Sequence, residues 1–176
     1  FAKTHSPGFR CVFFGGGYRW HAPGGDETTR GENSDGPVQF RPLEPSRSFS
    51  EFLSKNAHIG VELAEWNIER EYSQSFRSLE FLRHGLPLIC NRYLPVSRLI
   101  EQYDAGWVVD EPASLDSLLS GIVAEPEEWR KKSENARKLV NDALQPVRSL
   151  APLTDWLERP VKAAKLEPEA GTGDAA

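Results

Sequence analysis

The stretch Ser73–Cys90, SQSFRSLEFLRHGLPLIC, decides how the rest of this sequence is interpreted. Gly85 and Pro87 are typical of a helix end, so the sequence predicts a helix over about Ser75–His84, most of which we expect to be buried. An apolar run follows at once and predicts a buried strand. The question is why an arginine and a glutamate lie three residues apart on this helix.

Small polar residues crowd the predicted start of the helix: Ser73, Gln74, Ser75 and Ser78. The free backbone N–H groups and the dipole of a helix start favour an anion. Arg77 in the first turn is mildly unfavourable by the dipole alone, but a bound phosphate would reverse that sign. Glu80, one turn further, would reach a neutral hydroxyl beside the phosphates. Open α/β sheets bind nucleotides where such a helix start lies next to the carboxyl end of a strand.

A purely structural interpretation of the two charges stays open. Arg77 and Glu80 could pair with each other, and Glu80 could pair with Arg83 or His84 on a solvated face. The spacing alone does not separate an anion site from these ion pairs.

Short apolar runs alternate with helical patterns on both sides of this stretch. Strands are predicted at 9–14, 38–43, 59–63, 86–90 and 106–110, and helices at 48–56, 75–84, 94–103, 115–123 and 126–140. This alternation predicts an α/β fold with a Rossmann-like parallel sheet and helices on both faces. The polar, glycine-rich stretch 18–37 predicts a loop. We expect one domain over 1–160 and a disordered, solvated tail over 161–176.

Composition excludes several classes of function. The formal net charge is −5, so we expect no nucleic-acid partner, and no stretch approaches the roughly 20 apolar residues of a membrane span. The two cysteines, Cys11 and Cys90, lie in apolar runs and are predicted to be buried thiols in a reducing, cytoplasmic compartment. The four histidines show no metal-ligand spacing, so we expect no metal.

The chain contains no methionine and starts at Phe1, so we expect a fragment that lacks an N-terminal part. The glycines Gly15, Gly16 and Gly17 begin like a dinucleotide-binding motif, but Trp20 takes the place of the third glycine. A site for a nicotinamide cofactor is therefore not predicted.

Three pieces of the sequence in this order carry a resemblance to a known family: SFRSLEFLRHGLPLIC, AGWVVD and NARKLV. Together they resemble the C-terminal, donor-binding domain of GT-B glycosyltransferases of the family 4 (group 1) type, over about Val38–Val140. The resemblance implies one half of a GT-B fold. The N-terminal acceptor domain and the first strand of the present domain would precede Phe1.

The resemblance also implies a binding site for a nucleotide diphosphate sugar. Glu80 would bind the ribose, Arg77 would stabilise the departing diphosphate, and the turn Ser73–Ser75 would offer backbone N–H groups to the phosphates. The segment Arg41–Leu43 would lie near the base, with Gly15 and Gly16 near the donor. The implied chemistry retains anomeric configuration and uses neither a metal nor a further cofactor.

The sequence departs from the family at one important position. The family has two glutamates eight positions apart, and Tyr72 stands where the first would touch the donor sugar. Glu71 is its neighbour, so either the register shifts by one, or Tyr72 or a neighbouring side chain binds the donor in a different way.

We therefore expect the donor-binding half of a hexosyltransferase-type enzyme, inactive as a fragment. Its acceptor would be bound mainly by the absent domain, and peripheral contact with the inner face of a membrane is compatible with the sequence. Two alternatives remain: a nucleotide-sugar epimerase of GT-B fold, and a non-catalytic binding or assembly domain.

Overall fold

The computed structural model describes residues 9–14, 36–110 and 115–160. The chain forms two compact units, Phe1–Val140 and Asn141–Ala176. Gly15, Gly16, nearly all of the predicted polar loop and the predicted tail from residue 161 lie outside the described residues.

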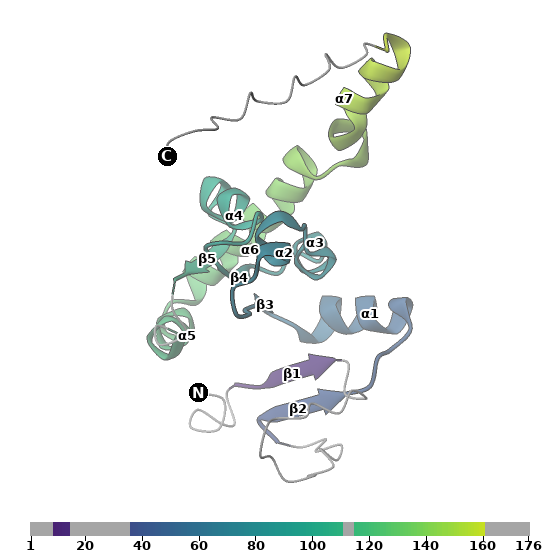
Figure 1. Cartoon of the computed structure of the whole chain (residues 1–176). Helices are drawn as coiled ribbons and strands as arrows, with labels where there is room; N and C mark the ends of the chain where they lie inside the picture. The colour runs from purple at the N-terminus through teal and green to yellow at the C-terminus, as the bar shows by residue number, and fades with distance from the viewer. Residues whose placement is uncertain (1–8, 15–35, 111–114, 161–176) are drawn as a thin grey trace, which may run out of the picture. The chain divides into compact units, whose positions relative to one another are not determined.

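The described residues of the first unit form five short strands: β1 (Cys11–Phe14), β2 (Val38–Arg41), β3 (Gly60–Glu62), β4 (Leu88–Asn91) and β5 (Gly106–Val109). All described pairs are parallel. Hydrogen bonds join β1 to β2 in one sheet, and β4 lies between β3 and β5 in another (Figure 1). The predicted strands are therefore confirmed with shorter bounds, and they form two sheets among the described residues where the sequence suggested one.

Helices connect and flank these strands: α1 (Ser46–Asn56), α2 (Ile68–Tyr72), α3 (Phe76–Arg83), α4 (Ser97–Tyr103), α5 (Leu115–Ala124) and α6 (Pro126–Ala143). A further helix, α7 (Pro146–Glu158), belongs to the second unit. The predicted α/β class with parallel strands and flanking helices is confirmed. The short α2 and the late α7 were not predicted.

Helix α3 begins and ends where the sequence predicted. The side chain of its N-cap residue, Ser75, accepts a hydrogen bond from the backbone N–H of Ser78. At the other end Gly85 has a φ of 71°, a left-handed conformation that favours glycine. The chain can therefore leave the helix and enter β4 within a few residues.

The hydrophobic core surrounds β4, whose four residues are all buried. On one face Ile89 packs with Val109 of β5 and with Leu119 and Ile122 of α5. Trp129 of α6 packs against the same cluster. Apolar burial of this kind is the main stabilising term of the fold.

Close approach of two strands requires a glycine at position 106. A Cβ atom there would lie 2.0 Å from the carbonyl oxygen of Leu88. Because Gly106 and Leu88 are direct partners in the β4–β5 ladder, neither strand can move aside without breaking that ladder.

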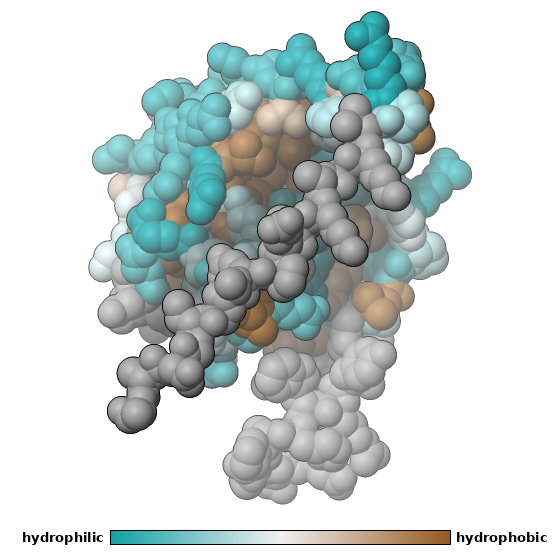
Figure 2. Space-filling view, turned by 45° about the horizontal axis from the view of Figure 1, so that its top comes forward, coloured by the Kyte–Doolittle hydropathy of each residue, from teal (hydrophilic) through white to brown (hydrophobic). Residues whose placement is uncertain are grey.

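The two cysteines differ in burial. Cys90 is fully buried as predicted, whereas Cys11 is only half-buried. Where grey atoms do not cover the face shown in Figure 2, hydrophilic residues gather along its rim and apolar residues lie between them. No helix within the described residues is long and apolar enough to cross a membrane.

The second unit contains α7, none of whose residues is buried. Its exposed apolar side chains recur at helical spacing: Val147, Leu150, Leu153, Trp156 and Leu157. The guanidinium of Arg148 donates a hydrogen bond to the carbonyl oxygen of Asp142 at 2.7 Å.

Candidate functional site

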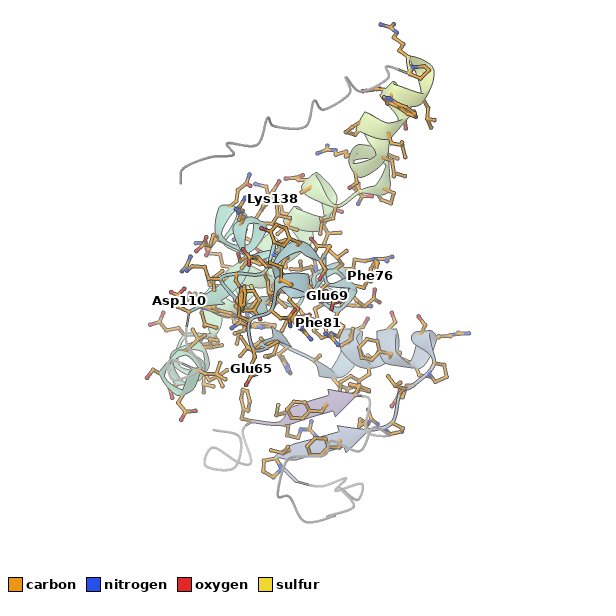
Figure 3. All side chains as sticks on the ribbon, in the orientation of Figure 1. Glu65, Glu69, Phe76, Phe81, Asp110 and Lys138 are labelled. Carbon is orange, nitrogen blue, oxygen red and sulfur yellow. The ribbon has the colours of Figure 1, made fainter. Side chains whose placement is uncertain are left out.

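A hollow of about 600 Å³ lies beside the start of α3. Residues of α2, of the turn that follows it and of the first turn of α3 form its wall, and Figure 3 labels two of them, Glu69 and Phe76. Its lining is Glu62, Asn67, Glu69, Arg70, Ser73, Gln74, Ser75, Phe76, Arg77 and Leu94. The hollow therefore joins a helix start to the carboxyl end of β3, the edge of a parallel sheet where ligands bind.

A buried carboxylate, that of Glu62 at the end of β3, organises this wall. Its Oε2 accepts hydrogen bonds from the hydroxyls of Ser75 at 2.6 Å and Ser78 at 3.1 Å. Its Oε1 accepts one from the Arg77 guanidinium at 3.1 Å. Arg70 lies 3.5 Å from the same oxygen. This network was not predicted.

The charge state of Glu62 follows from these partners. Burial alone would raise its pKa, but the hydrogen bonds from Ser75, Arg77 and Ser78 outweigh burial, so the pKa is lowered overall. Glu62 is thus an ionised internal anion at the start of α3, held against the positive end of the helix dipole.

Arg77 keeps most of its hydrogen-bonding capacity despite this pairing. Its side chain is 67% exposed, while that of Glu62 is 3% exposed. A guanidinium has five N–H donors in a planar fork, and one of them contacts Glu62. Glu62 therefore orients Arg77 and leaves its other donors facing the solvent.

Helix α2 positions the second guanidinium of the wall. Asn67 caps this helix, because its Oδ1 atom accepts a hydrogen bond from the backbone N–H of Arg70 at 2.9 Å. The cap fixes the first turn of α2. It therefore also fixes the backbone position of Arg70, which lines the hollow.

Several of the predicted site residues meet in this hollow, namely Ser73, Gln74, Ser75 and Arg77. Tyr72 is 78% exposed and does not line it. Gly15 and Gly16 lie outside the described residues.

The predicted base-binding segment lies elsewhere. The guanidinium of Arg41 lies over the ring of Phe52, 4.9 Å from its centroid, and 3.6 Å from the carboxylate of Glu44. Leu43 is 75% exposed. Neither Arg41 nor Leu43 lines the hollow.

Glu80 also points away from the lining. Its Oε1 lies 3.2 Å from Nε2 of His84, and its Oε2 lies 3.9 Å from Arg83. Both ring nitrogens of His84 contact hydroxyls of α1, those of Ser50 at 3.0 Å and Ser54 at 2.9 Å. In this conformation Glu80 makes the contacts of the structural alternative, an ion pair with Arg83 and a hydrogen bond with His84.

The arrangement is suited to an anionic ligand more than to a metal. Within the described parts of the chain, no group of three histidine, cysteine or carboxylate side chains could hold a metal ion. The exposed donors of Arg77 and the polar turn before α3 can instead hydrogen-bond a phosphate.

Parallel strands with flanking helices and a polar hollow at a helix start make this an α/β chain of Rossmann-like type. Its fold matches one such half of a GT-B fold. A similar solved structure is that of WaaG, a glycosyltransferase involved in lipopolysaccharide biosynthesis, with a TM-score of 0.51 and 20% sequence identity. The match covers 73% of this chain and 32% of WaaG, so this chain spans about a third of the length of that protein. No family model matches the sequence, and no curated protein does either.

Proposed function

We propose that this chain is the donor-binding half of a retaining, metal-independent GT-B glycosyltransferase. It would bind a nucleotide diphosphate sugar whose hexosyl group passes to an acceptor held mainly by another domain. One observation carries the proposal: two guanidinium groups and a polar turn meet at the start of α3, beside the carboxyl end of β3. The fold shared with WaaG supports it.

In this proposal, Arg77 and the start of α3 stabilise the negative charge of the leaving diphosphate. Arg77 keeps an exposed guanidinium at the helix start, where a phosphate would also meet the positive end of the dipole. Preorganised donors aimed at developing negative charge lower the barrier of such a transfer. Glu80 would hold the ribose, which requires its carboxylate to leave His84.

One observation favours a second function, a non-catalytic binding or assembly domain. Glu62 already supplies an anion to Arg77 and Ser75, and Tyr72 stands where the resemblance implies a sugar-contacting glutamate. A domain that had lost its donor would retain this internally neutralised arrangement.

Calorimetric titration with UDP, GDP, ADP and dTDP, each without metal, separates the two functions. For a donor-binding domain we expect saturable binding of at least one nucleotide. Arg77→Ala should weaken that binding by about 1–3 kcal/mol, the scale of hydrogen bonds to a charged group. Arg98→Ala, which removes an exposed arginine of α4, is the matched control and should leave the affinity unchanged.

Glu80→Ala tests the ribose contact separately. A loss of about 1–3 kcal/mol in nucleotide affinity with unchanged thermal stability supports a binding role. If the melting temperature falls while the affinity of the folded protein holds, Glu80 is only the ion-pair partner of His84 and Arg83. If none of the four nucleotides binds and pull-down experiments capture a stable partner, the non-catalytic binding or assembly function is supported.

A further inference from the structure

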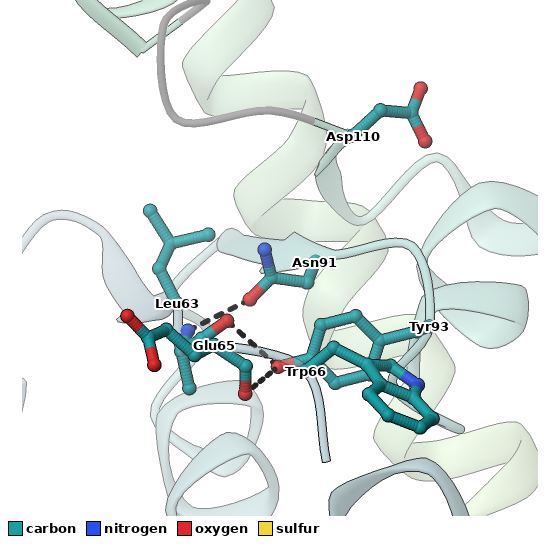
Figure 4. Close-up of a pocket in the computed structure, with 7 residues that line it drawn as sticks. Leu63, Glu65, Trp66, Asn91, Tyr93 and Asp110 are labelled. Atoms are coloured by element: carbon teal, nitrogen blue, oxygen red, sulfur yellow. Dashed lines mark hydrogen bonds between the residues drawn. The ribbon is translucent and has the colours of Figure 1, made fainter.

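A second hollow, of about 480 Å³, lies at the carboxyl ends of all three strands of the larger sheet. Residues 63–66 follow β3, Asn91 ends β4 and Asp110 follows β5, and all of these line it (Figure 4). Small-molecule sites span about 300–1,000 Å³ and occur at this edge of parallel sheets. The hollow has room for one sugar ring.

Three hydrogen bonds hold one wall of this hollow in place. Oδ1 of Asn91 accepts a hydrogen bond from the backbone N–H of Ala64 at 2.8 Å. The hydroxyl of Tyr93 is shared between the carbonyl oxygens of Ala64 at 2.8 Å and Glu65 at 3.0 Å. Burial raises the pKa of Tyr93, which keeps this hydroxyl protonated. The segment is therefore fixed before any ligand arrives.

Trp66 offers an aromatic face at this wall. Its side chain is 62% exposed, yet its indole N–H donates a hydrogen bond to Oε2 of Glu71 at 3.0 Å, which fixes the ring. The face of an aromatic ring is electron-rich, and the axial C–H groups of a pyranose carry partial positive charge, so the two surfaces attract. An exposed indole held in this way is a platform for a sugar ring.

Polar groups suited to hydroxyls line the same hollow as Trp66. The carboxylate of Glu65 is exposed, and none of the described residues pairs with it. Asp110 uses one oxygen to bind Arg92, and its side chain is 66% exposed. Among the described residues none accepts a hydrogen bond from Nδ2 of Asn91. Carboxylate and amide groups match the donors and acceptors of neighbouring sugar hydroxyls.

The negative charge of this hollow favours neutral sugars over anionic ones. Glu65 and Asp110 both line it, and like charges repel, so an anionic ligand such as a uronic acid or a sugar phosphate is disfavoured. In this respect it differs from the hollow beside α3, where Arg70 and Arg77 stand beside the carboxylates of Glu62 and Glu69.

We propose that the hollow at the carboxyl ends of β3, β4 and β5 binds one neutral pyranose unit of a saccharide. The ring stacks on Trp66, and Glu65, Asn91 and Asp110 bind its hydroxyls. The inference stands without the nucleotide site, because it involves a different cavity, different residues and an uncharged ligand.

Nuclear magnetic resonance of the full chain tests it, with methyl α-D-glucopyranoside, methyl α-D-galactopyranoside and methyl glucuronide as probes. We expect saturable shifts of the Trp66 indole N–H and the Asn91 side-chain amide with at least one neutral glycoside. Trp66→Ala should weaken that binding by about tenfold or more. The glucuronide should bind more weakly than the neutral glucoside.

Matched variants keep the test decisive. Trp156→Ala removes an exposed tryptophan of α7 that lines neither hollow, and should leave glycoside binding unchanged. If Trp66→Ala does not fold, Trp66→Tyr and Trp66→Leu replace it, and the tyrosine variant should bind while the leucine variant should not. Absence of saturation with both neutral glycosides overturns the proposal. Equal glycoside binding by the unmodified protein and Trp66→Ala, or by Trp66→Tyr and Trp66→Leu, also overturns it. So does tighter binding of the glucuronide than of the neutral glucoside. None of these outcomes depends on whether a nucleotide binds beside α3.

Discussion

Replacing Glu62 tests whether a buried carboxylate organises the start of α3. The carboxylate accepts hydrogen bonds from two serine hydroxyls and one guanidinium within 3.1 Å. Glu62→Ala removes all three acceptor contacts, and Glu62→Gln removes the charge at nearly constant volume. If the network is as described, both variants lower the free energy of unfolding.

The size of the loss follows from the burial of each partner. Ser78 has no exposed surface, so its hydroxyl would lose its acceptor without reaching water, at a cost of about 1–3 kcal/mol. Arg77 is largely exposed and becomes hydrated again, so its share is about 1 kcal/mol or less. Removing the desolvated carboxylate itself offsets part of the loss. We expect Glu62→Ala to lower the free energy of unfolding by about 1–3 kcal/mol.

The same network predicts a pH dependence with a definite sign. The pKa of Glu62 is lower in the folded protein than its ordinary value, so the native state binds this proton more weakly than the unfolded chain. Its contribution to stability is therefore complete above the ordinary carboxyl pKa of about 4.3 and is lost as the pH falls through the lower native value. The stability difference between the unmodified protein and Glu62→Gln should shrink over this interval.

Urea unfolding followed by circular dichroism and tryptophan fluorescence measures these differences. Glu51→Ala is the control, because Glu51 pairs with Lys55 at 2.6 Å on an exposed face of α1. That variant should lose about 0.5 kcal/mol or less. Equal losses for Glu62→Ala and Glu51→Ala, or a difference independent of pH, would refute the reasoning.

Two further predictions concern the sheet that contains β4. Burial, reinforced by nearby carboxylates, raises the pKa of Cys90 to about 12, so Ellman's reagent should modify the half-buried Cys11 first and Cys90 only after unfolding. Equal rates for the two thiols in the folded protein would contradict this. Gly106→Ala places a Cβ atom 2.0 Å from the Leu88 carbonyl oxygen and should cost about 3 kcal/mol or more in urea unfolding, or prevent folding. At Gly121 the new Cβ would meet no atom within 4 Å apart from its chain neighbours and the backbone of its own helix, so Gly121→Ala should stabilise α5 by about 0.5–1 kcal/mol. A similar loss in both variants would oppose the steric argument.

Much of the fold could be predicted because its signals are local. Apolar runs bounded by glycine and proline marked the strands, and the hydroxyl of Ser75 with the left-handed Gly85 marked both ends of α3. The division of the strands into two sheets was not predictable, because strand partners are set by contacts between residues far apart in the chain.

The two helices that were missed had weak or contradictory signals. Helix α2 has five residues, too few to show a helical period. Helix α7 contains Pro152 in its interior, which argues against a helix. Its apolar residues nevertheless recur three or four positions apart from Val147 to Trp156, and this was the available signal.

In the candidate site, too, contacts between residues close in sequence were predictable and contacts between distant residues were not. The pairing of Glu80 with Arg83 and His84 was foreseen as an alternative, since all three lie on one face of α3. Glu62 was missed, because its partners follow 13 to 16 positions later in the sequence. A carboxylate inside an apolar run was the signal, since such a group requires donors from elsewhere in the fold.

The pairing of β4 on both of its sides has a consequence for local opening. Among the described strands, β4 is the only one with a hydrogen-bonded neighbour on each edge, and all its residues are buried. Its amides should therefore exchange with deuterium only through the largest opening of the first unit, whereas those of β1 and β2 exchange through smaller fluctuations. The order in which deuterium enters the strands would show which part of the chain still holds structure when the rest has opened.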